Sequence, residues 1–168
     1  MPIPDKALIV GLGATGIGVA KFLGKMGKEI TLTDIKSESE LTDSLKELNG
    51  VSYKGCFGER YMEGFERYPV IIISPGVDSE SPHLVDARSK GIKVIGEIEF
   101  ASQFVKEPII AITGTNGKTT VTSLVGEIFK KVYGGDIFVG GNIGNPLINY
   151  VMEGRKARYV ILEISSFQ

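Results

Sequence analysis

The chain has 168 residues, of which 42% are hydrophobic and 23% charged, a composition that excludes a disordered or fibrous protein. Its net charge of -1 excludes a strongly basic surface for nucleic acid or anionic lipid, and its one cysteine, Cys56, excludes an internal disulfide. We therefore expect a soluble, cytoplasmic protein that binds neither nucleic acid nor membrane. The 22 glycines are clustered, which predicts backbone that turns tightly or lies close to a bound group.

The first half of the chain alternates between strand and helix patterns. Four apolar runs predict buried strands, at residues 6–10, 29–33, 70–73 and 93–95. The predicted helices between them end at Gly27, Gly50 and Gly91. The last of these helices begins at Ser81-Pro82, a cap followed by proline at the first helical position. This alternation predicts an α/β fold with a parallel sheet and helices on both faces.

A second α/β unit is predicted after a connection within residues 96–108. Its expected strands are residues 109–112, 137–139 and 159–164. One apolar stripe predicts a long helix after the first of them, formed by Val121, Leu124, Val125, Ile128, Phe129 and Val132. The chain stops directly after the last strand, so we expect this second unit to be truncated. An incomplete sheet leaves an open strand edge, which predicts a tendency to associate.

A glycine-rich loop follows the first strand. Residues 11–16, Gly-Leu-Gly-Ala-Thr-Gly, match G-x-G-x-x-G before a helix, and Asp34 ends the next strand 18 residues after Gly16. Glycine lets the backbone approach a phosphate, and the helix N-terminus supplies N–H donors. The pattern predicts a diphosphate at this turn, either of a nicotinamide dinucleotide or of another nucleotide. A tight turn without a ligand is the alternative interpretation.

A second short loop, Ser74-Pro75-Gly76, ends the third predicted strand. In an open parallel sheet, ligands bind beyond the carboxyl ends of the strands. The loop therefore either lines the same crevice as residues 11–16 or is a plain turn.

A phosphate loop is predicted at residues 113–120, Thr-Gly-Thr-Asn-Gly-Lys-Thr-Thr, between a strand and the long helix. Backbone N–H groups in such a loop wrap phosphates, Lys118 reaches the terminal phosphates, and the Thr119 hydroxyl binds magnesium. The general pattern requires glycine where this chain has Ile112, so the loop departs from it. Glu163 ends an otherwise apolar strand, where a charge is costly unless it is paired or binds a metal. It is the candidate carboxylate for the magnesium, with a salt bridge as the alternative.

The string Gly114-Thr115-Asn116-Gly117-Lys118-Thr119 resembles the ATP loop of the Mur ligases and their folylpolyglutamate synthase relatives. Four further strings resemble the branch of that family that adds D-glutamate: residues 11–16, 74–76, 140–144 and 163–168. The resemblance covers the whole chain in the right order. It implies a Rossmann-like domain at 1–96, followed at 97–168 by the front part of a P-loop-type ATPase domain.

The resemblance also implies roles for individual residues. The first glycine loop would hold the diphosphate of a UDP-sugar instead of NAD. The UDP-sugar contacts implied are Gly13, Ala14, Thr15, Asp34, Ile35, Lys36, Ser74, Pro75 and Gly76, with Asn142, Ser165 and Gln168 toward the muramoyl part. The ATP contacts implied are Gly114, Thr115, Asn116, Gly117, Lys118, Thr119 and Thr120. Lys118 and Glu163 would be catalytic, and Thr119 and Glu163 would bind Mg²⁺.

The reaction implied is an ATP-dependent amide ligation in peptidoglycan precursor synthesis. D-Glutamate would be added to UDP-N-acetylmuramoyl-L-alanine through an acyl phosphate. The full-length protein is expected to be a monomer, and this chain alone to be inactive because further family residues would lie beyond Gln168. Two alternatives remain open at this stage: an NAD(P)-binding oxidoreductase or regulatory module, which leaves the Lys118 loop unexplained, and a non-catalytic nucleotide-binding module.

Overall fold

The computed structural model describes residues 3–142 and 144–165. The chain divides into two compact units, Met1–Glu97 and Ile98–Gln168. No helix in the described residues is long and apolar enough to cross a membrane.

The first unit contains a five-stranded sheet. Its strands are β1 (Lys6–Val10), β2 (Glu29–Asp34), β3 (Lys54–Phe57), β4 (Val70–Ile73) and β5 (Lys93–Gly96). Its helices are α1 (Ala14–Lys25), α2 (Thr42–Lys46) and α3 (Pro82–Ser89), with 3₁₀ turns η1 (Gly58–Arg60) and η2 (Phe65–Arg67) between β3 and β4. A helix not expected from the sequence, α4 (Glu97–Ser102), lies in the predicted connection.

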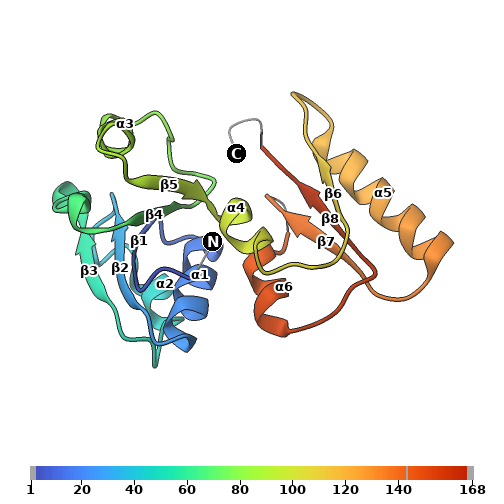
Figure 1. The fold of residues 1–168 in the computed structure, drawn as a ribbon, viewed down its shortest axis with the longest axis horizontal. Helices are drawn as coiled ribbons and strands as arrows, with labels where there is room; N and C mark the ends of the chain where they lie inside the picture. Colours follow the sequence, from blue (N-terminus) through green and yellow to red (C-terminus); the bar gives the residue numbers. More distant parts are fainter. Residues whose placement is uncertain (1–2, 143, 166–168) are drawn as a thin grey trace. The chain divides into compact units, whose positions relative to one another are not determined.

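The strand order is β3-β2-β1-β4-β5, and all pairs are parallel. The direction in which successive strands are added to the sheet reverses at β1, because β2 lies on one side of β1 and β4 lies on the other. Right-handed crossovers then place α1 and α3 on opposite faces (Figure 1). A crevice outside the carboxyl ends of β1 and β4 is where ligands bind in sheets of this kind. The predicted α/β class and parallel sheet are confirmed.

The core of the first unit explains which strands could be predicted. β1, β2 and β4 are almost entirely buried, which is why their apolar runs stand out in the sequence. β3 was missed because it is an exposed edge strand, Lys-Gly-Cys-Phe, that carries no apolar run. Its position is set by pairing with β2, from Thr31↔Lys54 to Asp34↔Phe57.

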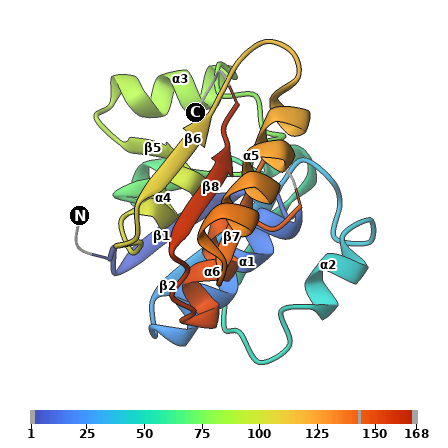
Figure 2. The same ribbon diagram turned by 90° about the vertical axis from the view of Figure 1, so that its right-hand side faces the viewer.

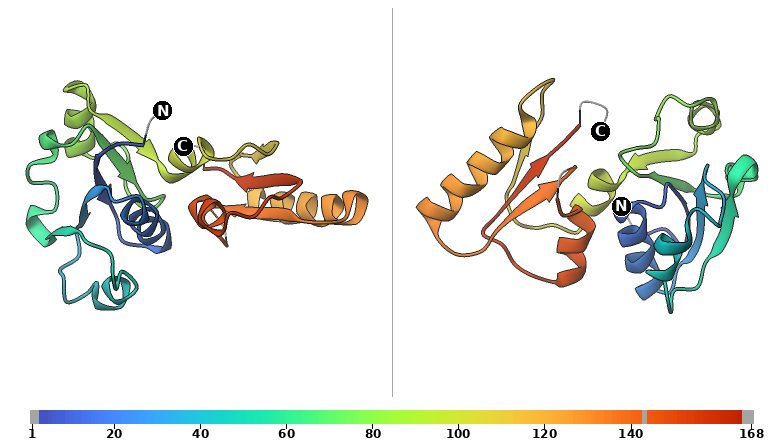
Figure 3. Two further views of the ribbon diagram at one scale, coloured as in Figure 1. Left: turned by 60° about the horizontal axis from the view of Figure 1, so that its bottom comes forward. Right: turned by 180° about the vertical axis from the view of Figure 1, so that it is seen from behind.

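The second unit contains a three-stranded parallel sheet in the order β6-β8-β7. The strands are β6 (Ile109–Ile112), β7 (Ile137–Gly141) and β8 (Tyr159–Glu163), and the helices are α5 (Lys118–Tyr133) and α6 (Leu147–Glu153). α5 runs along one face of this sheet (Figures 2 and 3). β8 is the central strand, so the carboxyl end of β8 lies between those of β6 and β7.

The apolar stripe predicted for α5 is mostly not the buried face. Leu124 is 58% exposed and Val132 66% exposed, while the fully buried positions of the helix are Thr122 and Gly126. A Cβ on Gly126 would lie 2.7 Å from Cγ2 of Val139, so the absence of a side chain lets α5 approach β7 closely. The predicted long helix is confirmed, but only Val125 and Phe129 of its apolar stripe are partly buried, because small residues pack against the sheet instead.

Candidate functional site

The glycine loop between β1 and α1 is tied to both neighbouring strands. Gly11 has φ +89°, and its N–H donates a 2.8 Å hydrogen bond to the Thr33 carbonyl at the end of β2. The Ser74 hydroxyl donates a 2.8 Å hydrogen bond to the Gly11 carbonyl from the end of β4. The loop is thus fixed at the carboxyl edge of three adjacent strands, where the sequence predicted it.

Two glycines of this loop have different physical explanations. A Cβ on Gly16 would lie 2.0 Å from the Gly11 carbonyl oxygen, so glycine there is required by the packing of the turn. Gly13, the N-cap of α1, has φ −76°, and a Cβ there would meet nothing within 4 Å. Neither backbone conformation nor packing requires glycine at position 13. Open space directly before a helix N-terminus is what a bound phosphate needs.

Asp34 is the acid that completes the predicted fingerprint, and both of its carboxylate oxygens already accept hydrogen bonds. The N–H of Leu12 donates to Oδ2 at 2.8 Å, and the N–H of Lys36 donates to Oδ1 at 3.0 Å. The side chain therefore holds the glycine loop against the end of β2. This positioning contact was not foreseen from the sequence, and each oxygen retains a lone pair for a ligand.

The other residues predicted for the UDP-sugar lie around the same edge. Ile35 and Lys36 follow β2, and Ile35 is 71% exposed. Ser74 is buried, whereas Pro75 and Gly76 are exposed, and a Cβ on Gly76 would meet nothing within 4 Å. Ala14 is exposed and Thr15 half-buried in the first turn of α1. The first unit thus brings together its nine predicted UDP-sugar residues.

The phosphate loop lies between β6 and α5. Gly114 and Gly117 have φ of +153° and +74°, and α5 begins at Lys118, directly after Gly117. The Lys118 ammonium donates to the carbonyl oxygen of Gly114 at 2.7 Å and to that of Thr115 at 3.5 Å. The Lys118 ammonium thus lies over the loop, where phosphate oxygens of a ligand can replace these two carbonyl oxygens as its hydrogen-bond acceptors. Thr115, Asn116 and Thr120 are exposed along the same segment.

Thr119 and Glu163 form the polar centre of the second unit. The Thr119 hydroxyl donates a 2.8 Å hydrogen bond to Oε2 of Glu163, which is only 5% exposed at the end of β8. Register pairs Glu163 with Ile112 of β6 and with Gly141 of β7. The sheet therefore brings the carboxylate to the helix N-terminus from 44 residues away.

The end of β7 and the residue that follows it pack tightly against β8. A Cβ on Gly141 would lie 2.5 Å from the Glu163 carbonyl oxygen, so glycine there serves packing and not only ligand approach. The Asn142 N–H donates to the same oxygen at 3.0 Å, while its buried Oδ1 has no hydrogen-bond partner within the described residues. Ser165 is half-buried just beyond β8. Gln168, predicted for the muramoyl part, lies outside the described residues.

The chemistry of Thr119 and Glu163, beside the phosphate loop, fits Mg²⁺ bound together with ATP. A hydroxyl and a carboxylate are oxygen donors of the kind that Mg²⁺ prefers, and phosphates and waters normally complete its octahedron. Within residues 3–142 and 144–165, no group of three or more His, Cys, Asp or Glu side chains is arranged to hold a metal ion. The Thr119–Glu163 pair therefore suits an ion that arrives with phosphate oxygens.

The fold and these two loops are typical of α/β nucleotide-binding proteins, in which one turn faces a diphosphate and a second loop faces phosphates. Comparison with known families makes the assignment specific. The model of the Mur ligase MurD-like N-terminal domain matches residues 5–96, and that of the Mur ligase middle domain matches residues 112–168. The chain belongs to the Mur ligase family with a MurD-like N-terminal domain.

Individual relatives agree with this assignment. The chain is 51% identical over 161 residues to a UDP-N-acetylmuramoylalanine–D-glutamate ligase of Geobacter metallireducens, covering 96% of this chain and 35% of that protein. It is 48% identical over 163 residues to the ligase of the same name from Geotalea daltonii, covering 97% and 36%. The chain thus spans about a third of the length of these relatives.

A solved structure shows the same fold. The UDP-N-acetylmuramate:L-alanyl-gamma-D-glutamyl-meso-diaminopimelate ligase of Neisseria meningitides superposes with a TM-score of 0.51 and 18% sequence identity. The match covers 99% of this chain and 56% of that one. The expected Rossmann-like unit and partial ATPase unit are confirmed at the level of fold.

Proposed function

We propose that this chain is the nucleotide-binding part of an ADP-forming ligase that adds D-glutamate to UDP-N-acetylmuramoyl-L-alanine in peptidoglycan precursor synthesis. The names of relatives up to 51% identical support this substrate pair. The observation that carries the proposal is the buried Glu163 carboxylate bonded to Thr119 at the start of the phosphate-loop helix. We further propose that the full-length protein acts as a monomer in the cytoplasm and uses residues 1–96 and 97–168 as its first and second domains.

In the first unit, the proposed ligand is the uridine diphosphate of the substrate. The N-terminus of α1 at Gly13, Ala14 and Thr15 would face the diphosphate with free N–H groups. Asp34, Ile35 and Lys36 would contact the uridine on one side, and Ser74, Pro75 and Gly76 would contact it on the other. Asn142, Ser165 and Gln168 are proposed contacts of the muramoyl part.

In the second unit, residues 114–120 would hold the phosphates of ATP. Lys118 would neutralise charge on the terminal phosphates, and Thr119 and Glu163 would hold Mg²⁺. When bound, the metal neutralises charge on the transferring phosphoryl group. Lys118 would add a second positive charge fixed in position before the reaction, which is how preorganised electrostatics lowers such barriers.

The proposed chemistry has two balanced steps. The alanyl carboxylate of the substrate attacks the γ-phosphorus of ATP, forming an acyl–oxygen–phosphorus bond as the bond to ADP breaks. The amine of D-glutamate then forms the amide bond, inorganic phosphate leaves, and the amine releases a proton. The chain is proposed to bind nucleotide but not to complete this reaction, since it spans about a third of its relatives' length.

Two measurements test the proposal. Calorimetry on the 168-residue chain should detect binding of UDP-N-acetylmuramoyl-L-alanine and none of NAD. Binding of NAD without binding of the UDP-sugar would instead assign the first glycine loop to a nicotinamide dinucleotide. In the full-length protein, Lys118→Ala should lower ligation at least about 100-fold, as expected for loss of one preorganised charge. Near-normal turnover of that variant would overturn the assignment of the phosphate loop.

A further inference from the structure

Thr122, in the second turn of α5, is a buried polar residue that has no part in the roles above. Its side chain is 0% exposed, and within residues 3–142 and 144–165 its Oγ1 has no hydrogen-bond partner. A buried hydroxyl without a partner costs free energy, and a helical threonine often avoids that cost by bonding to the carbonyl one turn earlier. That bond is not made here. A valine of the same shape would carry no such cost, so the hydroxyl at this position requires an explanation.

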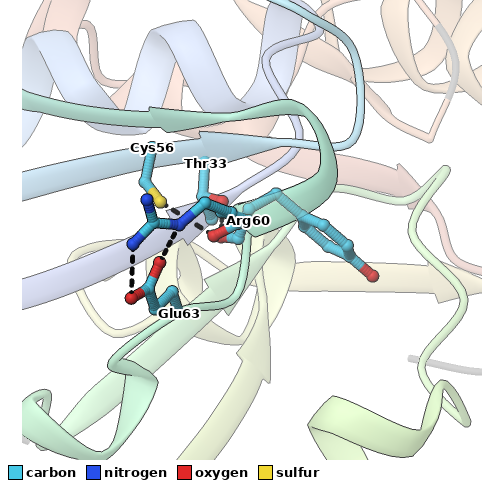
Figure 4. Close-up of polar contacts among 5 residues, drawn as sticks. Thr33, Cys56, Arg60 and Glu63 are labelled. Carbon is cyan, nitrogen blue, oxygen red and sulfur yellow. Dashed lines mark hydrogen bonds and ion pairs between the residues drawn. The ribbon is translucent and has the colours of Figure 1, made fainter.

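Buried threonines of the first unit show the usual arrangement. Thr33 is 0% exposed, and its hydroxyl donates to the Tyr61 carbonyl (Figure 4). Thr31 is 5% exposed, and its hydroxyl accepts a 2.8 Å hydrogen bond from the hydroxyl of Tyr68. Thr122 departs from this arrangement, which indicates a partner that is met in another state of the protein.

The contacts of α5 show that it runs antiparallel to β8. Near the start of the helix, the Thr119 hydroxyl meets Glu163, the last residue of β8. Near the end of the helix, the rings of Phe129 and Tyr133 lie 5.0 and 5.1 Å from that of Tyr159, the first residue of β8. Successive turns of the helix can therefore be matched to successive levels of the sheet.

This matching places Thr122 level with the end of β7. Gly126 lies over Val139, since a Cβ on Gly126 would be 2.7 Å from Cγ2 of Val139. Thr122 is four residues earlier in α5, which is about 6 Å along the helix axis. Gly141 is two residues after Val139, which is about 6.6 Å along the strand in the same direction. Thr122 thus faces the sheet at the level of Gly141.

Glu163 lies at this same level, because register pairs it with Gly141. Its side chain is on the α5 face of the sheet, as its bond to Thr119 shows, and Gly141 adds no side chain beside it. Within residues 3–142 and 144–165, the bond from Thr119 is the one side-chain hydrogen bond that Glu163 makes. The buried carboxylate and the buried hydroxyl of Thr122 therefore occupy neighbouring positions under α5.

We propose that Thr122 is a positioning residue of the metal site, and that its hydroxyl donates to the Glu163 carboxylate when Mg²⁺ is bound with ATP. This inference rests on the proposed function, in which Thr119 and Glu163 hold the ion. Carboxylates that bind a metal are themselves held by hydrogen bonds from groups behind them. Once Thr119 turns its oxygen to the ion, Thr122 is the hydroxyl on the same helix face that can supply this bond.

The test compares threonine, valine and serine at position 122 in the 168-residue chain. Thr122→Val keeps the shape and removes the hydroxyl. It should bind ATP about tenfold more weakly than wild type with Mg²⁺ and equally well without it, as expected for a group behind a metal ligand. Without ATP and Mg²⁺, its thermal unfolding midpoint should be higher than that of wild type, because the unpaired hydroxyl is gone. Thr122→Ser should restore Mg²⁺-dependent binding, and Ser123→Ala, which removes an exposed hydroxyl next to it, should change neither measurement.

A double variant tests whether Thr122 acts through Glu163. In the Glu163→Gln background, Thr122→Val should cause no further loss of Mg²⁺-dependent ATP binding, because the carboxylate that it positions is absent. Independent losses that multiply in the double variant would show that Thr122 acts elsewhere, and would overturn the proposal.

The other outcomes also decide. A wild-type chain that does not bind ATP with Mg²⁺ would overturn the proposed function, and this inference with it. Normal ATP binding by Thr122→Val, or equal losses with and without Mg²⁺, would overturn the positioning role alone. A lower unfolding midpoint for Thr122→Val would do the same, since it would show that the hydroxyl is already bonded in the ligand-free fold. If the valine variant fails to fold, Thr122→Ser and Thr122→Ala provide the same contrast, because both lack the methyl group and differ only in the hydroxyl.

Discussion

The Thr119 hydroxyl donates a 2.8 Å hydrogen bond to the Glu163 carboxylate, joining the first turn of α5 to the end of β8. A carboxylate that is 5% exposed costs free energy unless something charged or polar faces it, and one neutral hydroxyl compensates only part of that cost. A bound cation would compensate the rest. The pair therefore connects the stability of the second unit to its proposed ligand.

Glu163→Gln is the variant that tests this relationship, because it keeps the shape and an acceptor for Thr119 but removes the charge. ATP binding to the 168-residue chain should lose most of its Mg²⁺ dependence. We expect the affinity for ATP in the presence of Mg²⁺ to fall at least about tenfold, since even outer-shell partners of a metal contribute about 10–100-fold to metal affinity. Without Mg²⁺, thermal unfolding should show no loss of stability. An unchanged Mg²⁺ dependence in calorimetry would exclude Glu163 as a metal ligand.

Gly13→Ala and Gly16→Ala should have opposite signatures. At Gly16 the new Cβ would lie 2.0 Å from the Gly11 carbonyl oxygen, so we expect a loss of about 1–3 kcal/mol in the free energy of unfolding. At Gly13 the Cβ enters open space, so stability should fall by less than about 1 kcal/mol while UDP affinity drops. Urea unfolding and calorimetry measure the two effects. If Gly13→Ala retains full UDP affinity, the space above it is not a phosphate site.

Asp34→Ala and Asp34→Asn test whether the Asp34 carboxylate holds the glycine loop in place. Alanine leaves the Leu12 N–H without its partner, so we expect a loss of about 1–3 kcal/mol in the free energy of unfolding. Asparagine retains one oxygen acceptor and should recover part of that stability. Denaturant titration measures both. Equal stability of wild type and Asp34→Ala would show that the carboxylate does not hold the glycine loop.

The exposed apolar face of α5 should make the 168-residue chain self-associate as its concentration rises. Val121, Leu124, Ile128 and Val132 are 47–66% exposed along one side of the helix, and contiguous apolar surface of this kind favours association. Replacing Leu124 and Val132 by Gln should shift sedimentation toward monomer. Lys131→Gln, on the same helix, is the control expected to change nothing. Unaltered association of the double variant would place the contact elsewhere.

Acid should remove the stabilising effect of the ion pairs that Glu29 forms with Lys54 and Lys6, and it should do so over a defined pH range. Glu29 accepts a hydrogen bond from Lys54 at 3.0 Å and lies 3.6 Å from Lys6, and chiefly the Lys54 contact lowers the pKa of Glu29. A carboxyl with a lowered pKa in the folded state stabilises the fold above its unfolded pKa of about 4.3, and this contribution is lost as the pH falls through the folded value. Glu29→Gln should therefore show a smaller stability loss than wild type as the pH drops below about 4. Parallel losses in both proteins would assign the effect to other groups.

The sequence by itself determined the alternation of strands and helices, the two loops and the family. Each of these depends on residues close together in the chain: an apolar run ending in glycines, or Gly117-Lys118-Thr119 at a helix start. The apolar strand that Glu163 ends also made this residue recognisable in the sequence, because a single charge at such a position has few explanations. The roles assigned to individual site residues remain predictions.

Tertiary structure alone decided which partner each residue meets. β3 is defined by pairing with β2 and not by its own apolar pattern, and α5 turns Thr122 and Gly126 toward the sheet because small residues allow close approach. The pattern G-x-G-x-x-G does not distinguish Gly13 from Gly16, yet one faces open space and the other a carbonyl oxygen. Asp34 holds the glycine loop only because β1 and β2 are neighbours. Local spacing along the chain specifies conformation, whereas hydrogen bonds and packing depend on register between segments that are distant in sequence.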